Sequence, residues 1–269
     1  DLGDDGDDDD GDGAQSSAIG YGNGTAYWDD RYESQAGAPF DWYQGYGGLR
    51  ELLRHYVALS ARVLHVGCGN SRVGVEMVAD GYVGGVVNVD ISPVVIAQME
   101  AQQPSCDALS WRVADCTALS DDGDATYDAA IDKGTIDALL CGSDARTRVP
   151  AYLREMARVL RADGVFVLFT YGTPGMRLPY LDARGADGNN VYGWTVGVHC
   201  VMKKLQPNQQ LCEKEDPHHW VYVCRRGRGA NAATADVQYE GDDEQHARQC
   251  ADDARRRRDD DERKRASRQ

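Results

Sequence analysis

The segment RVLHVGCGNS, residues 62–71, constrains the fold of this chain more than any other feature. An apolar run rich in β-branched residues leads into a turn with Gly67 and Gly69, and a helical pattern follows. A second apolar run, VVNVD, then ends on the carboxylate of Asp90. This order of strand, glycine turn, helix and strand is typical of a nucleotide-binding βαβ unit, so it predicts an α/β sheet.

The glycine turn and Asp90 together indicate an adenosine ligand. Gly67 and Gly69 have no Cβ, so the turn can adopt unusual dihedrals and a ligand can approach its backbone N–H groups. A carboxylate at the end of the second strand can accept hydrogen bonds from two ribose hydroxyls. Arg72 stands where a dinucleotide site needs a third glycine, and no Walker-type Gly-Lys-Ser/Thr follows. The remaining common ligand is S-adenosylmethionine.

The charge distribution divides the chain into three parts. Residues 1–20 and 228–269 are predicted to be disordered, the first an Asp/Gly tail and the second a tail of mixed charge. The first thirteen residues alone hold eight Asp and supply more than half of the net charge of −15. Residues 21–227 are therefore expected to form one moderately acidic domain, which we expect to be a monomer.

Composition argues against several classes of protein. The one strong basic cluster, residues 255–258, lies among aspartates, which disfavours nucleic-acid binding and favours a basic protein partner. No signal-peptide pattern or long apolar stretch is present, so we expect a cytoplasmic protein that does not bind membranes. The eight cysteines contain no C-x-x-C pair, and the adjacent His218 and His219 complete no zinc pattern. We therefore expect reduced cysteines and no metal.

Periodicity along the chain predicts alternating strands and helices, followed by an antiparallel hairpin. Helices are expected at 46–60, 73–80, 93–103 and 151–160, and strands at 62–66, 85–89, 109–113, 127–131 and 164–171. The segments 191–204 and 219–226 are too closely spaced for a crossover helix and should pair with each other. Five parallel strands plus such a hairpin predict a seven-stranded Rossmann-like sheet with helices on both faces.

Six short motifs occur in one order between about Tyr27 and Arg226. They are YWDDRYE (27–33), FDWYQGY (40–46), VGCGNS (66–71), DISPVVI (90–96), VADCTAL (113–119) and IDKGTIDALL (131–140). This set resembles the methyltransferase-like family that includes the eukaryotic elongation factor 1-alpha lysine methyltransferases. The resemblance implies a class I, S-adenosylmethionine-dependent methyltransferase with a protein substrate, possibly elongation factor 1-alpha.

Carried over position by position, the resemblance implies a set of cofactor contacts to which the turn adds Gly69. The residues are Trp28, Tyr32, Trp42, Gly67, Asp90, Ile91, Asp115, Cys116 and Lys133. An acceptor carboxylate at 115 suits the adenine amino group, and aromatic rings near a sulfonium gain about 0.5–2 kcal/mol of cation–π attraction. The aromatic residues are expected to form a lid, and Lys133 to act through its backbone carbonyl.

The chain departs from common methyltransferase patterns at three places. His65 stands where many of these enzymes carry an acidic residue, and Ser71 where many have a third glycine. We therefore expect the methionine end of the cofactor to be held in a different way. The segment DARGADGNN, residues 182–190, is expected to be a flexible loop near the carboxyl ends of the strands, which would alter the substrate face.

The leading hypothesis is a protein-lysine N-methyltransferase, with two alternatives open. A small-molecule methyltransferase and a cofactor-binding scaffold without catalysis fit the same motifs. Amine methylation of nucleic acid is disfavoured because residues 132–135 read Asp-Lys-Gly-Thr. An acceptor lysine must lose a proton before transfer. Asp132, Asp137 and Tyr171 are candidate bases that spacing does not separate, so no catalytic residue is assigned.

Overall fold

The computed structural model describes residues 24–35, 39–202, 218–227 and 238–241, with the single positions 252 and 256. The predicted tail 1–20 and most of the predicted tail 228–269 lie outside this part of the chain. The strands of the described residues are Val63–Val66 (β1), Val86–Asp90 (β2), Leu109–Val113 (β3), Tyr127–Lys133 (β4), Leu160–Thr170 (β5), Trp194–Met202 (β6), His218–Arg226 (β7) and Gln238–Gly241 (β8). The helices are Gly24–Ser34 (α1), Tyr46–Tyr56 (α2), Val73–Ala79 (α3), Pro93–Gln102 (α4), Thr135–Cys141 (α5), Ala145–Val159 (α6) and Pro174–Leu181 (α7).

All of these strands belong to one sheet, whose order is β3-β2-β1-β4-β5-β7-β6-β8. Strands β1 to β5 pair in parallel, whereas β7 is antiparallel to both β5 and β6. The predicted seven-stranded Rossmann-like plan with its antiparallel hairpin is confirmed. Strand β8 pairs in parallel with β6 at the edge, which adds a short strand from the 228–269 stretch.

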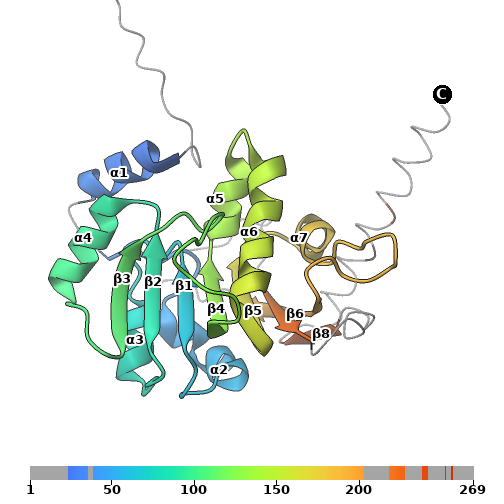
Figure 1. Ribbon diagram of the computed structural model, residues 1–269, viewed down its shortest axis with the longest axis horizontal. Coiled ribbons are helices and arrows are strands. Elements are labelled where there is room, and N and C mark those ends of the chain that lie inside the picture. The colour runs from blue at the N-terminus through green and yellow to red at the C-terminus, as the bar shows by residue number, and fades with distance from the viewer. Residues whose placement is uncertain are drawn as a thin grey trace, which may run out of the picture.

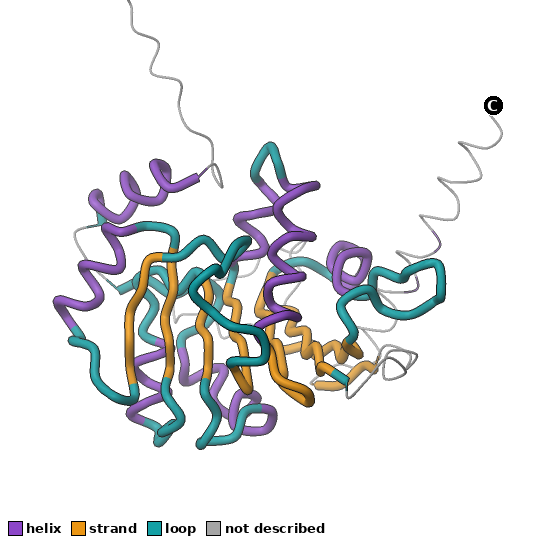
Figure 2. Tube along the Cα trace, in the orientation of Figure 1, coloured by secondary structure: helices purple, strands orange, loops and turns teal. Residues whose placement is uncertain are grey.

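Helices cover both faces of the sheet, as Figures 1 and 2 show. One face packs against α5, α6 and α7, through buried side chains such as Ile136, Leu153 and Leu181. The other packs against α2, α3 and α4, through Leu53, Met77 and Ile96 among others. Alternate residues of each central strand contribute to the two cores, which is why these strands read as continuous apolar runs in the sequence.

The sequence pattern missed three helices and misplaced the start of a fourth. Helices α5 and α7 have seven and eight residues, which is about two turns and too short for a clear apolar repeat. Helix α6 begins at Ala145, before the predicted 151, and contains Pro150. Proline lacks the N–H donor that a helix interior needs, so the residues before Pro150 do not read as helical in the sequence. The segment expected to be an aromatic lid contains α1.

The loop 182–190 lies at the opposite edge of the sheet from the one predicted. Its residues 187, 189 and 190 border the same surface hollow as residues 124, 125, 160 and 162, which precede or begin β4 and β5. Strand β6 runs parallel to β5 and must start at the amino edge, so α7 returns the chain to that edge first. The loop is therefore remote from the carboxyl ends of the strands and carries its own hydrogen bonds, such as Gly185 N to Asn189 O at 2.9 Å.

Other features of the described residues bear on the class of protein. No helix among them has the length and apolar character needed to cross a membrane. Cys68, Cys116 and Cys224 are buried free thiols, while Cys106 and Cys141 are exposed free thiols. Within the same ranges, no group of three His, Cys, Asp or Glu side chains is arranged to hold a metal ion.

Candidate functional site

A cleft of about 880 Å³, including its part open to solvent, lies at the carboxyl edge of the parallel strands. Its walls come from α1, from residues 40–42, from the turn after β1, from the end of β2, and from residues 114–116 and 133–139. All ten residues predicted for the cofactor site line it: Trp28, Tyr32, Trp42, Gly67, Gly69, Asp90, Ile91, Asp115, Cys116 and Lys133. The fold therefore brings together residues from six separate stretches of the sequence.

The turn after β1 requires glycine at both predicted positions. Gly67 and Gly69 have φ angles of +54° and +52°, in the left-handed region that residues with a side chain avoid. A Cβ on Gly67 would lie 2.1 Å from Oγ1 of Thr135, and that hydroxyl is itself fixed by donating to Val66 O at 3.0 Å. A Cβ on Gly69 would lie 2.7 Å from the Tyr32 hydroxyl. The backbone of Gly67 and Gly69 thus faces the cleft.

Asp90 is buried at the end of β2, with its carboxylate fixed by backbone N–H groups. Oδ2 accepts from Gly69 N at 2.9 Å and Oδ1 accepts from Ser92 N at 3.0 Å. Ser92 also begins α4, because its Oγ accepts from Val95 N at 3.2 Å. Burial raises the pKa of Asp90 to about 6, although these backbone hydrogen bonds favour the charged form. A carboxylate accepts about four hydrogen bonds, so acceptor capacity is left for a ligand.

Asp115 lies directly after β3 and is held by two neighbours. Its Oδ1 accepts from the backbone N–H and the hydroxyl of Thr117, at 2.9 and 2.8 Å. Arg148 of α6 also reaches it, with Nη2 at 3.2 and 3.3 Å from the two carboxylate oxygens. Arg148 lines the cleft but was not predicted, since nothing in the sequence relates a helix arginine to a loop 33 residues earlier.

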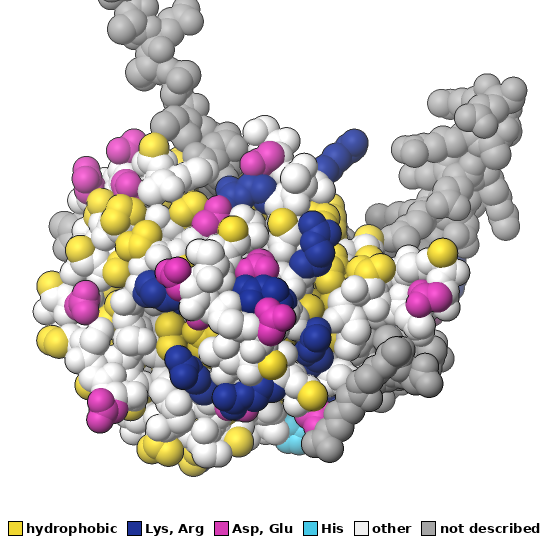
Figure 3. Space-filling view, in the orientation of Figure 1, with side chains coloured by type: hydrophobic (Ala, Val, Ile, Leu, Met, Phe, Trp, Pro, Cys, Tyr) yellow, Lys and Arg dark blue, Asp and Glu magenta, His cyan; other side chains and the backbone are white. Residues whose placement is uncertain are grey.

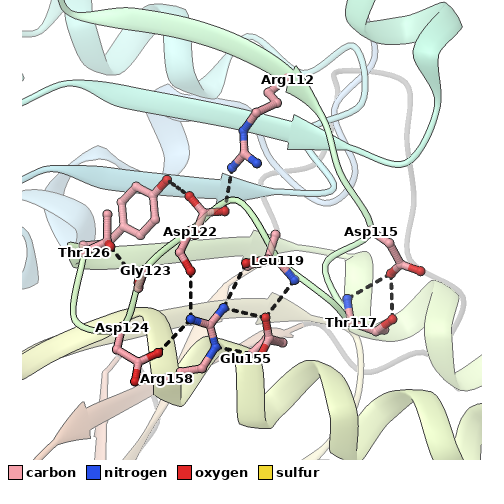
Figure 4. A network of polar contacts seen from close by, with 11 residues as sticks. Arg112, Asp115, Thr117, Leu119, Asp122, Gly123, Asp124, Thr126, Glu155 and Arg158 are labelled. Carbon is pink, nitrogen blue, oxygen red and sulfur yellow. Dashed lines mark hydrogen bonds and ion pairs between the residues drawn. The ribbon is translucent and has the colours of Figure 1, made fainter.

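The loop that carries Asp115 is fixed by a polar network, drawn in Figure 4. Arg158 of α6 donates to the carbonyl oxygens of Leu119 and Asp122, at 2.9 and 2.8 Å, and pairs with Glu155. Arg112 of β3 donates to the Asp122 carboxylate at 2.6 Å. These contacts span the connection between β3 and β4, so Asp115 and Cys116 are held by more than their own strand end. Burial raises the pKa of Cys116 well above its usual value, which keeps it a neutral thiol.

Helix α1 provides one wall of the cleft through a single face. Gly24, Trp28, Arg31, Tyr32 and Gln35 all line the cavity, and their spacing places them on the same side of the helix. The Trp28 and Tyr32 rings are stacked with centroids 6.0 Å apart. Helix α1 packs beside α4, where Gln98 Nε2 donates to Tyr32 O at 3.2 Å. Figure 1 shows α1 beyond the carboxyl ends of β2 and β3.

Lys133 fastens the segment that carries Trp42. Its Nζ lies 3.0 Å from Asp41 Oδ1 and donates to Trp42 O at 3.2 Å, and the lysine side chain is only 3% exposed. The Ser71 hydroxyl donates to the same Asp41 oxygen. Burial lowers the pKa of Lys133, while Asp41 favours the charged form. A lysine that would usually be solvated therefore joins β4 to the opposite wall.

The three candidate bases do not line the cleft. Asp132 begins α5 by accepting from Thr135 N and Ile136 N, at 2.7 and 3.0 Å, and from the Tyr152 hydroxyl at 2.7 Å. Burial raises its pKa to about 7. Asp137 pairs with Arg177, and Tyr171 is half-exposed after β5. Their contacts are those of residues that support the fold, and no catalytic base is assigned.

His65 stands at the position where many methyltransferases carry an acidic residue. It lines the cleft and is 1% exposed, with Nδ1 3.0 Å from Asn88 Oδ1. Burial lowers the pKa of His65 to about 4, so the imidazole is neutral near pH 7. This wall of the cleft supplies neither a carboxylate nor a positive charge.

The fold and cleft agree with a comparison to known families. The family described as "Methyltransferase domain" matches residues 60–228, which is more than half of the chain. The chain belongs to this family, which confirms the class that the six motifs indicated.

Two curated relatives are similar to this chain in sequence. "EEF1A lysine methyltransferase 4" of Mus musculus is 34% identical over 161 residues, which cover 56% of this chain and 62% of the relative. "eEF1A lysine and N-terminal methyltransferase" of Mus musculus is 36% identical over 178 residues, covering 65% of this chain and 24% of the relative. The chain thus spans less than two thirds of either relative.

A solved structure shares the fold at lower identity. The [4+2]-cyclase SpnF superposes with a TM-score of 0.52 at 16% identity, over 78% of this chain and 97% of that one. Because that protein is a cyclase, the fold alone does not define the reaction.

Proposed function

We propose that this protein is an S-adenosylmethionine-dependent protein-lysine N-methyltransferase that acts on elongation factor 1-alpha. The observation that carries the proposal is the convergence of all ten predicted residues on one cleft at the carboxyl edge of the sheet. In open α/β sheets this edge is where ligands bind. The relatives whose names include this substrate supply the choice of acceptor. Such an enzyme would work in the cytoplasm, where translation takes place.

The residues of the cleft fit S-adenosylmethionine. Asp90 retains acceptor capacity for ribose hydroxyls, and Asp115 can accept from the adenine amino group. Ile91 and the Cys116 thiol offer apolar surface for the base, and the left-handed glycine turn lets the ligand meet backbone. Trp28 and Trp42 add aromatic surface to the cleft, with Arg31 lying against both rings. When bound, the cofactor supplies a methyl group on a positively charged sulfur, ready for in-line transfer.

An acceptor lysine must be neutral when the methyl group is transferred. A free lysine has a pKa of about 10.4, and a nearby positive charge lowers it by disfavouring the ammonium form. The side chains of Arg31 and Lys133 both line the cleft. Lys133 is paired with Asp41 and Arg148 with Asp115, so these charges largely cancel. The protein's own contribution is alignment of the neutral amine.

A protein acceptor is supported by the surface around the cleft. Phe40 and Tyr171 are 40% and 49% exposed, although both are large and apolar. Phe40 lines the cleft and Tyr171 follows the carboxyl end of β5, so both lie at the same edge of the sheet. The face drawn in Figure 3 intersperses Lys and Arg with Asp and Glu and forms no continuous basic stripe of the kind that binds nucleic acid.

Purified protein, labelled S-adenosylmethionine and purified elongation factor 1-alpha provide the test. We expect label on one or more lysines of the factor, located by mass spectrometry, with no label from the Asp90→Ala variant. Label that appears only in the small-molecule fraction of a nuclease-treated extract would replace the proposal by small-molecule methylation. Binding of the cofactor with no labelled acceptor in factor or extract would replace it by a scaffold role.

A further inference from the structure

Arg31 differs from the other basic side chains that line the cleft. Lys133 is paired with Asp41, and Arg148 with Asp115. His65 is neutral and bonded to Asn88. Within the described ranges, by contrast, the Arg31 guanidinium has no carboxylate partner, although this half-buried side chain lines the cavity. Its charge is therefore available to a ligand.

Three aromatic rings surround the Arg31 guanidinium. The central carbon lies 5.2 Å from the centroid of Trp42, 5.6 Å from that of Phe40 and 6.0 Å from that of Trp28. Rings attract a guanidinium through its flat faces, whereas its N–H donors point outward in its own plane. The cage of Trp28, Phe40 and Trp42 thus surrounds the group without supplying an oxygen acceptor.

Arg31 lies over the glycine-turn end of the cleft rather than over the Asp115 end. Its neighbour Tyr32 brings its hydroxyl against Gly69, where an added Cβ would be 2.7 Å away. Trp42, in contact with Arg31, is tied to Lys133. In contrast, Asp115 is held by Arg148 from α6, on the other side of the sheet edge. A ligand with its nucleoside at Asp90 and Asp115 would extend its other end toward Arg31.

We propose that Arg31 binds the α-carboxylate of the cofactor's methionine end, as a planar guanidinium clamp supplied by α1. This inference rests on the proposed function. A guanidinium matches a carboxylate through two parallel hydrogen bonds, and those bonds are stronger than neutral ones. The contact would also explain how the methionine end is held although His65 replaces the common acidic residue. It would tie α1 to the amino-acid group of the ligand.

Calorimetry with two ligands tests the clamp separately from the rest of the site. S-adenosylhomocysteine carries the carboxylate, and S-adenosyl-3-thiopropylamine is the same molecule without it. Arg31→Gln should weaken S-adenosylhomocysteine about tenfold to a hundredfold, the usual cost of losing a charge-assisted hydrogen bond, and should change the thiopropylamine less than about threefold. Arg31→Lys should give an intermediate loss, because lysine keeps the charge without the planar fork.

Two matched arginine variants serve as controls. Arg148→Gln should weaken both ligands by similar factors, because it acts on Asp115 at the nucleoside end. Arg161→Gln should change neither, since this arginine pairs with Asp128 on the exposed surface. Melting curves establish that each variant is folded.

The outcomes separate this inference from the proposed function. If the unmodified protein binds S-adenosylhomocysteine and Arg31→Gln weakens both ligands equally or neither, the clamp is wrong while the cofactor site stands. If the unmodified protein binds neither ligand, the cofactor site itself is wrong and the clamp falls with it.

Discussion

The two ends of the cleft are built in different ways. At the end proposed to hold the nucleoside, called the nucleoside end below, Asp90 ends β2 and Asp115 lies just after β3. Both accept from backbone N–H groups, and Arg148 also reaches Asp115. At the lid end, α1 and residues 39–45 are held by side chains that reach across the molecule, such as Lys133 to Asp41. The first end is preorganised by the sheet edge, whereas the second depends on a few long-range polar contacts.

Tyr43 illustrates what the lid end requires. Its φ is +67°, in the left-handed region that is uncommon for a residue with a large side chain. Its hydroxyl donates to Asp137 Oδ2 at 2.5 Å, and the ring lies against Gly134. The surrounding contacts maintain this backbone conformation, which turns the chain so that Trp42 lines the cleft. Variants that break these contacts should therefore affect the lid more than the nucleoside end.

The largest effect is expected for Asp137→Ala. Asp137 and Arg177 form a pair with side chains only 3% and 2% exposed, so removal of the carboxylate leaves a buried guanidinium unpaired and also releases Tyr43. The free energy of unfolding should fall by about 3–5 kcal/mol in denaturant titrations. Asp128→Ala, which breaks the exposed Arg161 pair, should cost about 1 kcal/mol or less. Equal losses in the two variants would contradict the assignment of Asp137 as the buried anchor of the lid.

A smaller effect is expected for Asp41→Ala, which leaves the buried Lys133 ammonium without its carboxylate. Unfolding free energy should fall by about 2–3 kcal/mol, and tryptophan fluorescence should report increased exposure of Trp42. The double variant Asp41→Ala/Lys133→Met removes both charges and should recover part of the stability. The double variant should not recover cofactor affinity, because the contact between residues 133 and 41 that holds the lid is still absent. Full recovery of affinity would show that the ion pair does not position the lid.

The nucleoside end should respond to pH. Burial raises the pKa of Asp90 to about 6, so protonation below pH 6 should reduce S-adenosylhomocysteine affinity by up to about tenfold per pH unit, with a plateau above pH 7. The pH dependence of stability has the opposite sign for Asp90. The pKa of Asp90 is higher in the folded protein than the value of 3.8 in the unfolded chain. The contribution of Asp90 to the free energy of unfolding is therefore complete below pH 3.8 and is lost as the pH rises through 6. Calorimetry between pH 5 and 8 checks the affinity, and Asp90→Asn should remove the dependence.

The smallest effect is expected where the two ends meet. Ser92 caps α4 through Val95 N, and its hydroxyl donates to Asp29 of α1. Ser92→Ala should lower the unfolding free energy by about 1 kcal/mol, the usual cost of a lost N-cap. Hydrogen exchange should increase in α1 as well as in the first turn of α4. An increase confined to α4 would mean that Ser92 does not couple the two ends.

The sequence predicted the nucleoside end better than the lid. Strand periodicity, the glycine turn and Asp90 are local signals, because each depends on residues within one strand-turn-helix unit. The lid contacts join distant positions, such as Tyr43 and Asp137, which are 94 residues apart. No spacing rule relates such residues. The family resemblance placed Trp28 and Trp42 in the site, but the pairing of Lys133 with Asp41 and the cage around Arg31 required coordinates.

The most direct test of the account is calorimetric titration of S-adenosylhomocysteine into the unmodified protein and into Asp90→Ala. One saturable site is expected for the unmodified protein, with affinity reduced at least about a hundredfold by Asp90→Ala, because a buried acceptor is lost and two backbone N–H groups lose their partner. Absence of binding to the unmodified protein, or equal affinity for both, would contradict the claim that the carboxyl edge of this sheet holds the cofactor.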